Sequence, residues 1–153
     1  MEEQIMNMPA VALRGLTILP GMIAHFDISR ERSLRAVEEA MEQDQKIYLV
    51  TQRNVDSEDP TQEDLYQMGI VADIKQVVRL QNDVVRILVD GISRAALLGF
   101  TDNEKYLEAE ICYCDSNADS LPEDLREAML LGVREAFHRY AAVVGKISKE
   151  LIR

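Results

Sequence analysis

Residues 69–90 read GIVADIKQVVRL, then QND, then VVRILVD, and this stretch decides the fold. In its first part Ile70, Ala72 and Ile74 lie on one face of a strand, and Asp73 and Lys75 lie on the other. In its second part Val85, Ile87 and Val89 alternate with charged neighbours. A period of two is typical of a half-buried strand, and the Asn-Asp pair suits a tight turn. The stretch therefore predicts a β-hairpin, which we expect to end at Gly91.

Similar short apolar runs lie on both sides of this hairpin. They predict further strands at residues 9–13, 23–28, 47–50, 95–100 and 106–113. One helix is expected at residues 30–43, because Ser29 is a good N-cap and Leu34, Val37 and Met41 fall on one helical face. We therefore expect an α+β fold, in which a small twisted sheet or pseudo-barrel carries one packed helix.

The last part of the chain has a helical pattern instead. Ser120–Glu123 forms a capping box, and apolar residues then recur at intervals of three and four up to Val144. We expect one long helix at residues 121–144, ended by Gly145, and a new helix capped by Ser148. The expected domains are a β-rich domain at residues 1–115 and the start of a truncated helical subdomain at 120–153.

Charge and composition exclude several classes of partner. Of the 153 residues 47% are apolar, which is enough for a core, and the net charge is −10. Such a domain repels phosphate backbones and anionic membranes, so neither nucleic acid nor a membrane surface is an expected partner. No apolar run approaches the ~20 residues of a membrane span, and the acidic N-terminus is unlike a secretory signal. With Cys112 and Cys114 expected to be reduced thiols, we predict a cytoplasmic location.

The motifs that could carry catalysis are incomplete. Gly145-Lys146 lacks the glycine of a phosphate loop five residues earlier, where Tyr140 stands, and is followed by Ile147 instead of Ser or Thr. Cys112 and Cys114 have no second ligand pair for zinc, and the acidic loop at residues 56–64 lacks calcium-binding spacing. We therefore expect no catalytic, cofactor or metal residue. A hydrolase that uses His25 with Asp27 is the weakest alternative kept open.

Two apolar segments are candidate binding sites. The loop GLTILPGM at residues 15–22 carries Leu16, Ile18, Leu19 and Met22. These side chains either close the bottom of the core or form a partly exposed edge that contacts apolar segments of unfolded proteins. The predicted long helix carries a stripe that we expect to mediate weak self-association, formed by Leu125, Met129, Ala136, Phe137 and Tyr140.

The order of several segments resembles Lon proteases. AVALRG at 10–15, LPGM at 19–22 and FDISRERS at 26–33 are similar to their opening, and residues 69–74 and 85–94 are similar to later strands of the same domain. Leu125–Ala128 and Phe137 resemble the first helix that follows. The resemblance covers about residues 9–152. Ala12 and Ser29 depart from the residues that many Lon proteins have there.

The resemblance implies a substrate-recognition domain of an ATP-dependent serine protease of the AAA+ class. Such a hydrolase works as a cytoplasmic hexamer in protein quality control and degrades unfolded, damaged and selected regulatory proteins. Its ATP and Mg²⁺ site and its Ser-Lys dyad would lie beyond these residues, so the chain itself is not expected to be an enzyme. The alternative is a stand-alone Lon-like domain that binds proteins with no protease attached.

Overall fold

The predicted hairpin lies at the centre of a six-stranded sheet. In the computed structural model, β4 (Met68–Arg79) pairs antiparallel with β5 (Val85–Phe100). Asn82 and Asp83 form the turn with φ of 62° and 60°, the left-handed conformation that Asn and Asp tolerate. The structure describes residues 5–58, 60–114 and 122–145. The chain divides into two compact units, Met1–Cys114 and Asp115–Arg153, which are described separately below.

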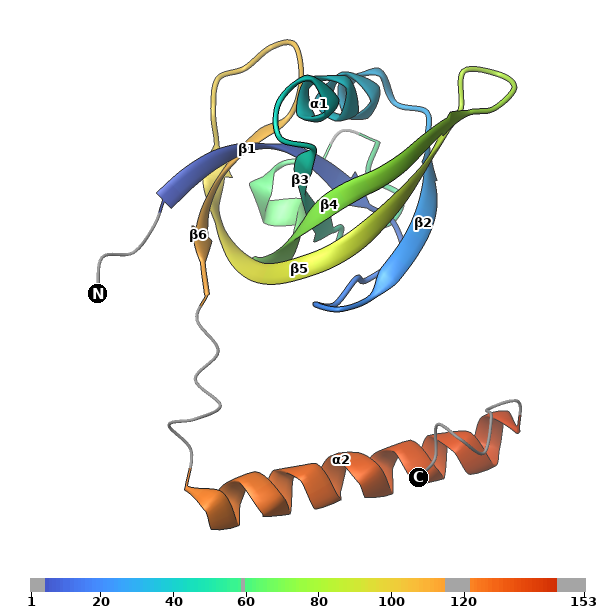
Figure 1. The fold of residues 1–153 in the computed structure, drawn as a ribbon, viewed down its shortest axis with the longest axis vertical. Helices are drawn as coiled ribbons and strands as arrows, with labels where there is room; N and C mark the ends of the chain where they lie inside the picture. Colours follow the sequence, from blue (N-terminus) through green and yellow to red (C-terminus); the bar gives the residue numbers. More distant parts are fainter. Residues whose placement is uncertain (1–4, 59, 115–121, 146–153) are drawn as a thin grey trace. The chain divides into compact units, whose positions relative to one another are not determined.

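The sheet of the first unit closes into a barrel (Figure 1). The other strands are β1 (Ile5–Leu13), β2 (Ile23–Ile28), β3 (Lys46–Thr51) and β6 (Glu108–Tyr113). The strand order is β2-β5-β4-β3-β1-β6, and β6 also pairs with β5, which closes the ring. Only β1 and β3 run parallel to each other. Strand β2 lies outside the ring and is paired to the first half of β5.

The length of β5 differs from the prediction. Gly91 does not end the strand. In all, β5 is 16 residues long, and it bends so that it belongs to two parts of the barrel. Val71 pairs with Ser93 and Ala72 pairs with Gly91, so Ile92 is an extra residue in a β-bulge. The glycine is required by a close approach from another loop. A Cβ on Gly91 would collide with the Leu19 carbonyl and would lie 2.8 Å from the Ile70 Cδ1 atom.

The barrel strands bury apolar residues on both of their faces. In β3, Ile47 and Leu49 join one core cluster, whereas Tyr48 and Val50 join the other. This explains why the sequence of β3 is continuously apolar. The Tyr48 hydroxyl donates a hydrogen bond to the Ala95 carbonyl at 3.0 Å, and burial raises the pKa of Tyr48 far above its ordinary value. A short 3-10 turn at Gln62–Asp64 leads into Leu65, which also joins the second cluster.

The helix α1 (Glu31–Glu42) packs on the first cluster, but two details differ from the prediction. The N-cap is Arg30 and makes no side-chain capping bond, so Ser29 was the wrong residue for this position. The buried residues are Ser33, Ala36, Val37 and Ala40, so Val37 of the predicted face is buried, and Leu34 packs against the first cluster. Met41 is exposed.

Strand β1 is also longer than predicted, because it begins at Ile5 and passes through Pro9.

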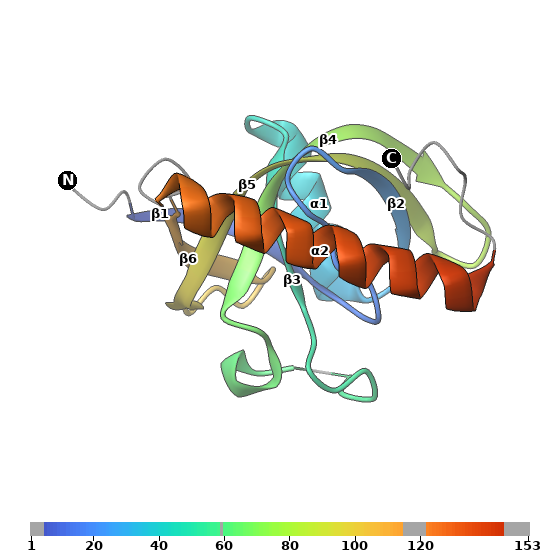
Figure 2. The same cartoon turned by 90° about the horizontal axis from the view of Figure 1, so that it is seen from below.

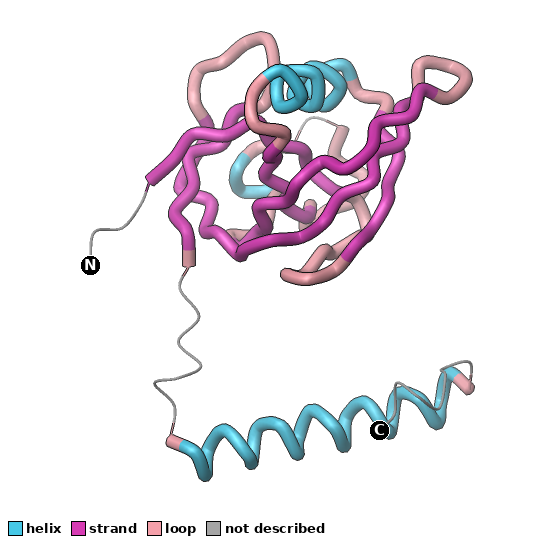
Figure 3. Tube along the Cα trace, viewed as in Figure 1, coloured by secondary structure: helices cyan, strands magenta, loops and turns pink. Residues whose placement is uncertain are grey.

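The second unit contains the long helix α2 (Glu123–Val144), an unbroken helix in Figures 2 and 3. The predicted stop is confirmed, because Gly145 has φ of 69° and its N–H donates to the Ala141 carbonyl at 2.9 Å. Ser120, Leu121 and Ser148, named in the predicted caps, lie outside the described residues. No residue of α2 is buried. None of the described helices is long and apolar enough to cross a membrane. The predicted α+β class, with a pseudo-barrel, one packed helix and a long helix, is confirmed.

The contact at Gly91 predicts a stability effect. We expect Gly91→Ala to lower the free energy of unfolding by about 1–3 kcal/mol, because the added methyl group overpacks against a backbone carbonyl. Urea unfolding followed by circular dichroism measures the effect. Gly99→Ala in the same strand is the matched control, since its new methyl group would meet nothing closer than 3.7 Å. Equal loss in both variants would show that the Gly91 contact does not matter.

Candidate functional site

The loop between β1 and β2 is held in place by backbone hydrogen bonds. The Gly21 N–H donates to the Gly91 carbonyl at 2.8 Å, and the Gly91 N–H donates to the Met22 carbonyl at 2.9 Å. At the other end, the Thr51 hydroxyl donates to the Leu16 carbonyl at 2.8 Å. Gly15 and Gly21 both have positive φ, which an alanine would adopt only with strain. The loop is thus fixed to the barrel at both ends.

This fixed backbone divides the apolar side chains between core and solvent. Ile18 is only 5% exposed and belongs to the first core cluster, with half-buried Leu16 packed against that cluster. Leu19 is 57% exposed and Met22 38%. The burial of Ile18 does not fit the expected role as a substrate contact, because its side chain is already used in packing. The loop therefore closes the core through Ile18 and Leu16, and it leaves Leu19 and Met22 at the surface.

Ile23, the first residue of β2, extends the exposed part of the loop. Its side chain is 67% exposed, and we refer to Leu19, Met22 and Ile23 together as the apolar edge. The sequence reasoning placed Ile23 at the start of a strand and did not include it among the candidate contacts. The signal was present: in a strand, Ile23 shares its face with His25 and Asp27, which are polar.

The His25 and Asp27 side chains do not form the start of a catalytic triad. The Asp27 carboxylate accepts hydrogen bonds from Arg86 Nε at 2.8 Å and from a second guanidinium nitrogen at 3.2 Å. These bonds lower the pKa of Asp27. The hollow beside His25 is lined by Gln76, Val78, Arg86 and Leu88, none of which is a nucleophile. The geometry therefore gives the hydrolase alternative no support.

The part of the chain that the structure describes contains no group of side chains that could bind a metal ion. Within residues 5–58, 60–114 and 122–145, no three or more His, Cys, Asp or Glu side chains gather around a point that could hold an ion. Cys112 and Cys114 are free thiols.

The predicted stripe of α2 is exposed within its own unit. Leu125, Met129, Ala136 and Tyr140 are exposed, and only Phe137 is half-buried. The Phe137 and Tyr140 rings lie 6.4 Å apart at 36° to each other. Two further exposed residues, Val133 and Val143, lie four and three residues after members of the stripe, and thus on the same face. The sequence reasoning omitted them, although the helical spacing could have identified them.

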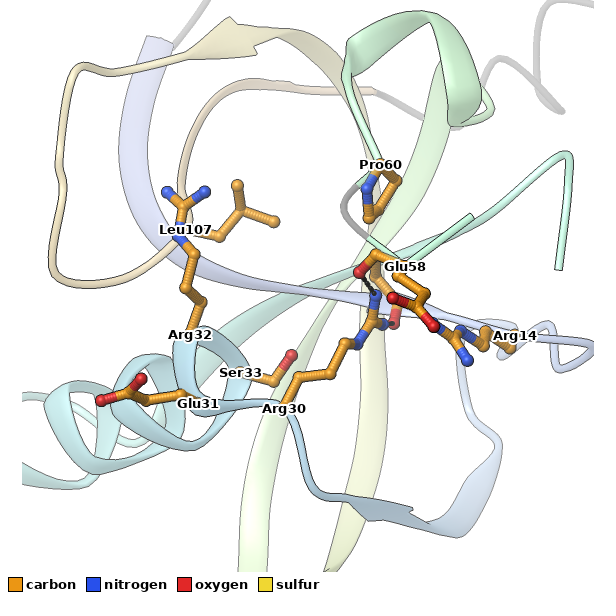
Figure 4. Close-up of a pocket in the computed structure, with 9 residues that line it drawn as sticks. Arg14, Arg30, Glu31, Arg32, Ser33, Glu58, Pro60 and Leu107 are labelled. Atoms are coloured by element: carbon orange, nitrogen blue, oxygen red, sulfur yellow. Dashed lines mark hydrogen bonds between the residues drawn. The ribbon is translucent and has the colours of Figure 1, made fainter. Parts of the chain in front are cut away.

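A pocket of about 560 Å³ lies beside the first turn of α1 (Figure 4). We call it the arginine pocket, since three of its residues are arginines. It is lined by Ala12, Arg14, Arg30, Glu31, Arg32, Ser33, Glu58, Pro60 and Leu107. No local pattern in the sequence indicates this pocket, because these residues come from four separate segments.

Solved structures identify the class of fold. The N-terminal domain of a Mycobacterium avium complex Lon protease matches with a TM-score of 0.59 at 18% identity, over 94% of this chain and 77% of that one. A Lon N-terminal domain protein from Xanthomonas campestris matches with a TM-score of 0.59 at 16% identity, over 86% and 72%. The barrel with its helices therefore has the fold of Lon N-terminal domains.

Sequence comparisons then give the family. Residues 7–153 match the family model of the ATP-dependent protease La (LON) substrate-binding domain. The Lon protease of Lachnoclostridium phytofermentans is 38% identical over 100% of this chain and 19% of its own length. That of Clostridium acetobutylicum is 35% identical over 99% and 19%. The chain belongs to the Lon substrate-binding domain family and spans about a fifth of the length of these relatives.

The Asp27–Arg86 pair predicts a pH-dependent change. Arg86→Gln should raise the pKa of Asp27 towards its ordinary value, because the hydrogen bonds from Arg86 are the main cause of the lowered pKa. The pair stabilises the fold above the ordinary carboxyl pKa, and this contribution disappears as the pH falls through the lowered pKa of the folded state. An NMR titration of the Asp27 carboxyl carbon measures the shift.

Arg79→Gln is the control for this titration. Arg79 is an exposed arginine of β4, and it is not among the groups that shift the pKa of Asp27. An unchanged Asp27 titration in Arg86→Gln would contradict the assigned cause.

Proposed function

We propose that this domain recognises unfolded, damaged and selected regulatory proteins for an ATP-dependent Lon-type serine protease. The observation that carries the proposal is the apolar edge, whose side chains stay exposed while the backbone behind them is fixed. The family description as a substrate-binding domain supports it. The compared relatives are named Lon proteases, which favours this reading over a stand-alone protein-binding module.

In this proposal the rest of the protein supplies the chemistry. A Lon-type protease would use ATP and Mg²⁺ for unfolding and a Ser-Lys dyad for cleavage, and it would act as a cytoplasmic hexamer. Residues 1–115 would form the recognition domain, and residues 120–153 would begin a helical subdomain. We propose protein as the partner of the first domain and exclude nucleic acid and membranes on the basis of the net charge of −10.

The physics of the apolar edge suits weak and general binding. Unfolded proteins share little beyond exposed apolar side chains, so a general receptor benefits from an adaptable apolar surface, to which Met22 contributes. Complete burial of one such side chain provides about 1.5–3 kcal/mol. Burial of the partly exposed side chains of the edge provides less binding free energy than this, and association itself costs free energy. One domain should bind feebly, whereas the tethered copies of a hexamer would hold a chain through raised effective concentration.

Substitution of the apolar edge tests this proposal. We expect chemical shifts of the ¹⁵N-labelled chain to change around residues 16–23 when a reduced casein peptide is added. Leu19→Ser and Met22→Ser should each weaken binding about fivefold, since each removes on the order of 1 kcal/mol of apolar contact. Leu98→Ser is the matched control, because Leu98 has a similar exposed fraction of 44% but lies near the far end of β5. The proposal fails if the shifts cluster elsewhere and both edge variants fold and bind as before.

We also propose that the stripe of α2 binds a second copy of the chain weakly. Its members are Leu125, Met129, Ala136, Phe137 and Tyr140, none of which is buried and of which only Phe137 is half-buried. Contiguous exposed apolar surface of this kind tends to associate. The proposal is limited to weak association, because a single helix face offers a small area.

Sedimentation velocity over a range of concentrations checks this association. We expect Met129→Glu to shift the chain towards monomer, because it places a charge in the centre of the stripe. Leu131→Glu is the matched control: Leu131 is equally exposed but lies two residues further on, and therefore on a different face of the helix. A strict monomer at high concentration, with the same behaviour in Met129→Glu, would contradict the proposal.

A further inference from the structure

Strand β2 is paired on one side only. It lies at the end of the strand order, outside the closed ring, and its partner is β5 (Figure 1). Within the part of the chain that the structure describes, no strand pairs with its other side. We call this the open side of β2. Its backbone groups are available to another strand, as those of any unpaired strand edge are.

The register shows which backbone groups face the open side. Residues opposite each other in an antiparallel pair alternate between those that exchange hydrogen bonds and those that do not. The Gly91 N–H donates to the Met22 carbonyl at 2.9 Å, and the pairing then continues through β2 without a shift. Ile23, His25 and Asp27 are therefore the positions whose N–H and C=O groups turn away from β5.

These backbone groups have no hydrogen-bond partner within residues 5–58, 60–114 and 122–145. The bonds between Asp27 and Arg86 involve side chains only. They fit a pair that exchanges no backbone hydrogen bonds, because the side chains of such a pair come closest together. The open side thus presents three donors and three acceptors at every second residue, which is the spacing of an extended chain.

A hollow beside β2 provides room for an added chain. It has a volume of about 180 Å³. Phe26, Asp27 and Ile28 line one part of the hollow, and Leu13 and Leu16 line another. An added strand would turn every second side chain towards this face of the sheet. The apolar edge lies at the other end of β2 and would contact the same chain.

We propose that β2 binds an extended segment of a substrate protein as an additional strand. A row of unpaired N–H and C=O groups is complementary to the backbone of an extended chain. Every unfolded protein has such a backbone, and bonds to it provide affinity with little dependence on sequence. This inference rests on the proposed function. It adds the backbone of the substrate to the apolar side chains as a feature that the domain recognises.

N-methylated peptides test the role of the backbone. The probe is acetyl-Lys-Val-Leu-Val-Thr-Val-Lys-amide, titrated into the ¹⁵N-labelled chain. N-methylation of its second, fourth and sixth residues blocks one side of the extended peptide and leaves the other side intact. N-methylation of its third, fourth and fifth residues blocks the centre of both sides. We expect the first form to bind as the unmodified peptide does and the second at least about tenfold more weakly, because main-chain hydrogen bonds are lost.

Amide hydrogen exchange gives a second measurement with its own reference positions. When the unmodified peptide is added, exchange at His25 and Asp27 should slow at least about fivefold, because their N–H groups gain partners. The N–H groups of Ala24 and Phe26 face β5 already, so their exchange should change little. Protection that alternates along β2 indicates an added strand, since apolar contact alone does not produce this pattern.

A proline substitution removes one donor from the open side. His25→Pro deletes the N–H of the central position and leaves the bonds to β5 in place, and proline is tolerated where a strand edge faces solvent. This variant should bind the unmodified peptide about fivefold more weakly. His25→Ala is the matched control, because it keeps the N–H and should bind normally. If circular dichroism shows that His25→Pro does not fold, the methylated peptides and the exchange pattern decide.

Three results would overturn the inference. They are equal binding of the two methylated peptides, protection that does not alternate along β2, and protection of His25 in the free chain that rises with protein concentration. The last result would assign the open side to a second copy of the chain.

The outcomes also separate this inference from the proposed function. If the two methylated peptides bind equally while Leu19→Ser and Met22→Ser weaken casein binding, the added strand is rejected and the proposed function stands. If the methylated peptides differ while both variants bind casein normally, the added strand is supported and the apolar edge is rejected.

Discussion

The packing of the loop before β2 against Gly91 is the contact on which the rest of the first unit depends. Gly21 and Met22 exchange backbone hydrogen bonds with Gly91, and the absence of a side chain at Gly91 lets the Leu19 carbonyl approach. This contact places the start of β2 beside the centre of β5. It also coincides with the bulge at Ile92, where the strand bends and passes from one side of the barrel to the other. The position of β2 follows from this contact, and the ring is closed further along β5, where residues 95–100 pair with β6.

The same contact determines which apolar side chains can meet another molecule. With the backbone of the loop fixed, Ile18 points into the core and Leu19 points out, although the two are neighbours in sequence. The exposed side chains are therefore presented on a rigid support and need little further ordering to bind. Burial of Ile18 stabilises the loop, and exposure of Leu19 and Met22 leaves it available. One short segment thus contributes to folding and, in the proposed function, also to recognition.

The sequence predicted those features that depend on local patterns. The alternation at 69–90 identified the hairpin, and Gly145 identified the end of α2, because both signals lie within a few residues. The continuation of β5 through Gly91 could not be predicted, because its cause is a loop about seventy residues earlier in the chain. The division between Ile18 and Leu19 depends on the same distant contact. The arginine pocket has no local signal at all, since Arg14, Arg30 and Arg32 are oriented by carbonyls of residues 12, 57, 58 and 103.

The apolar edge and the arginine pocket are connected along the chain. Arg14 of the pocket and Leu16 of the loop that carries the edge both line a smaller hollow, together with Phe26 and Asp27. The net charge of −10 repels acidic chains at long range, but salt screens this repulsion beyond about 8 Å at physiological ionic strength. Contacts inside a pocket are screened much less. Charged groups at the surface of this barrel would therefore act on the selectivity of a bound partner rather than on the rate of encounter.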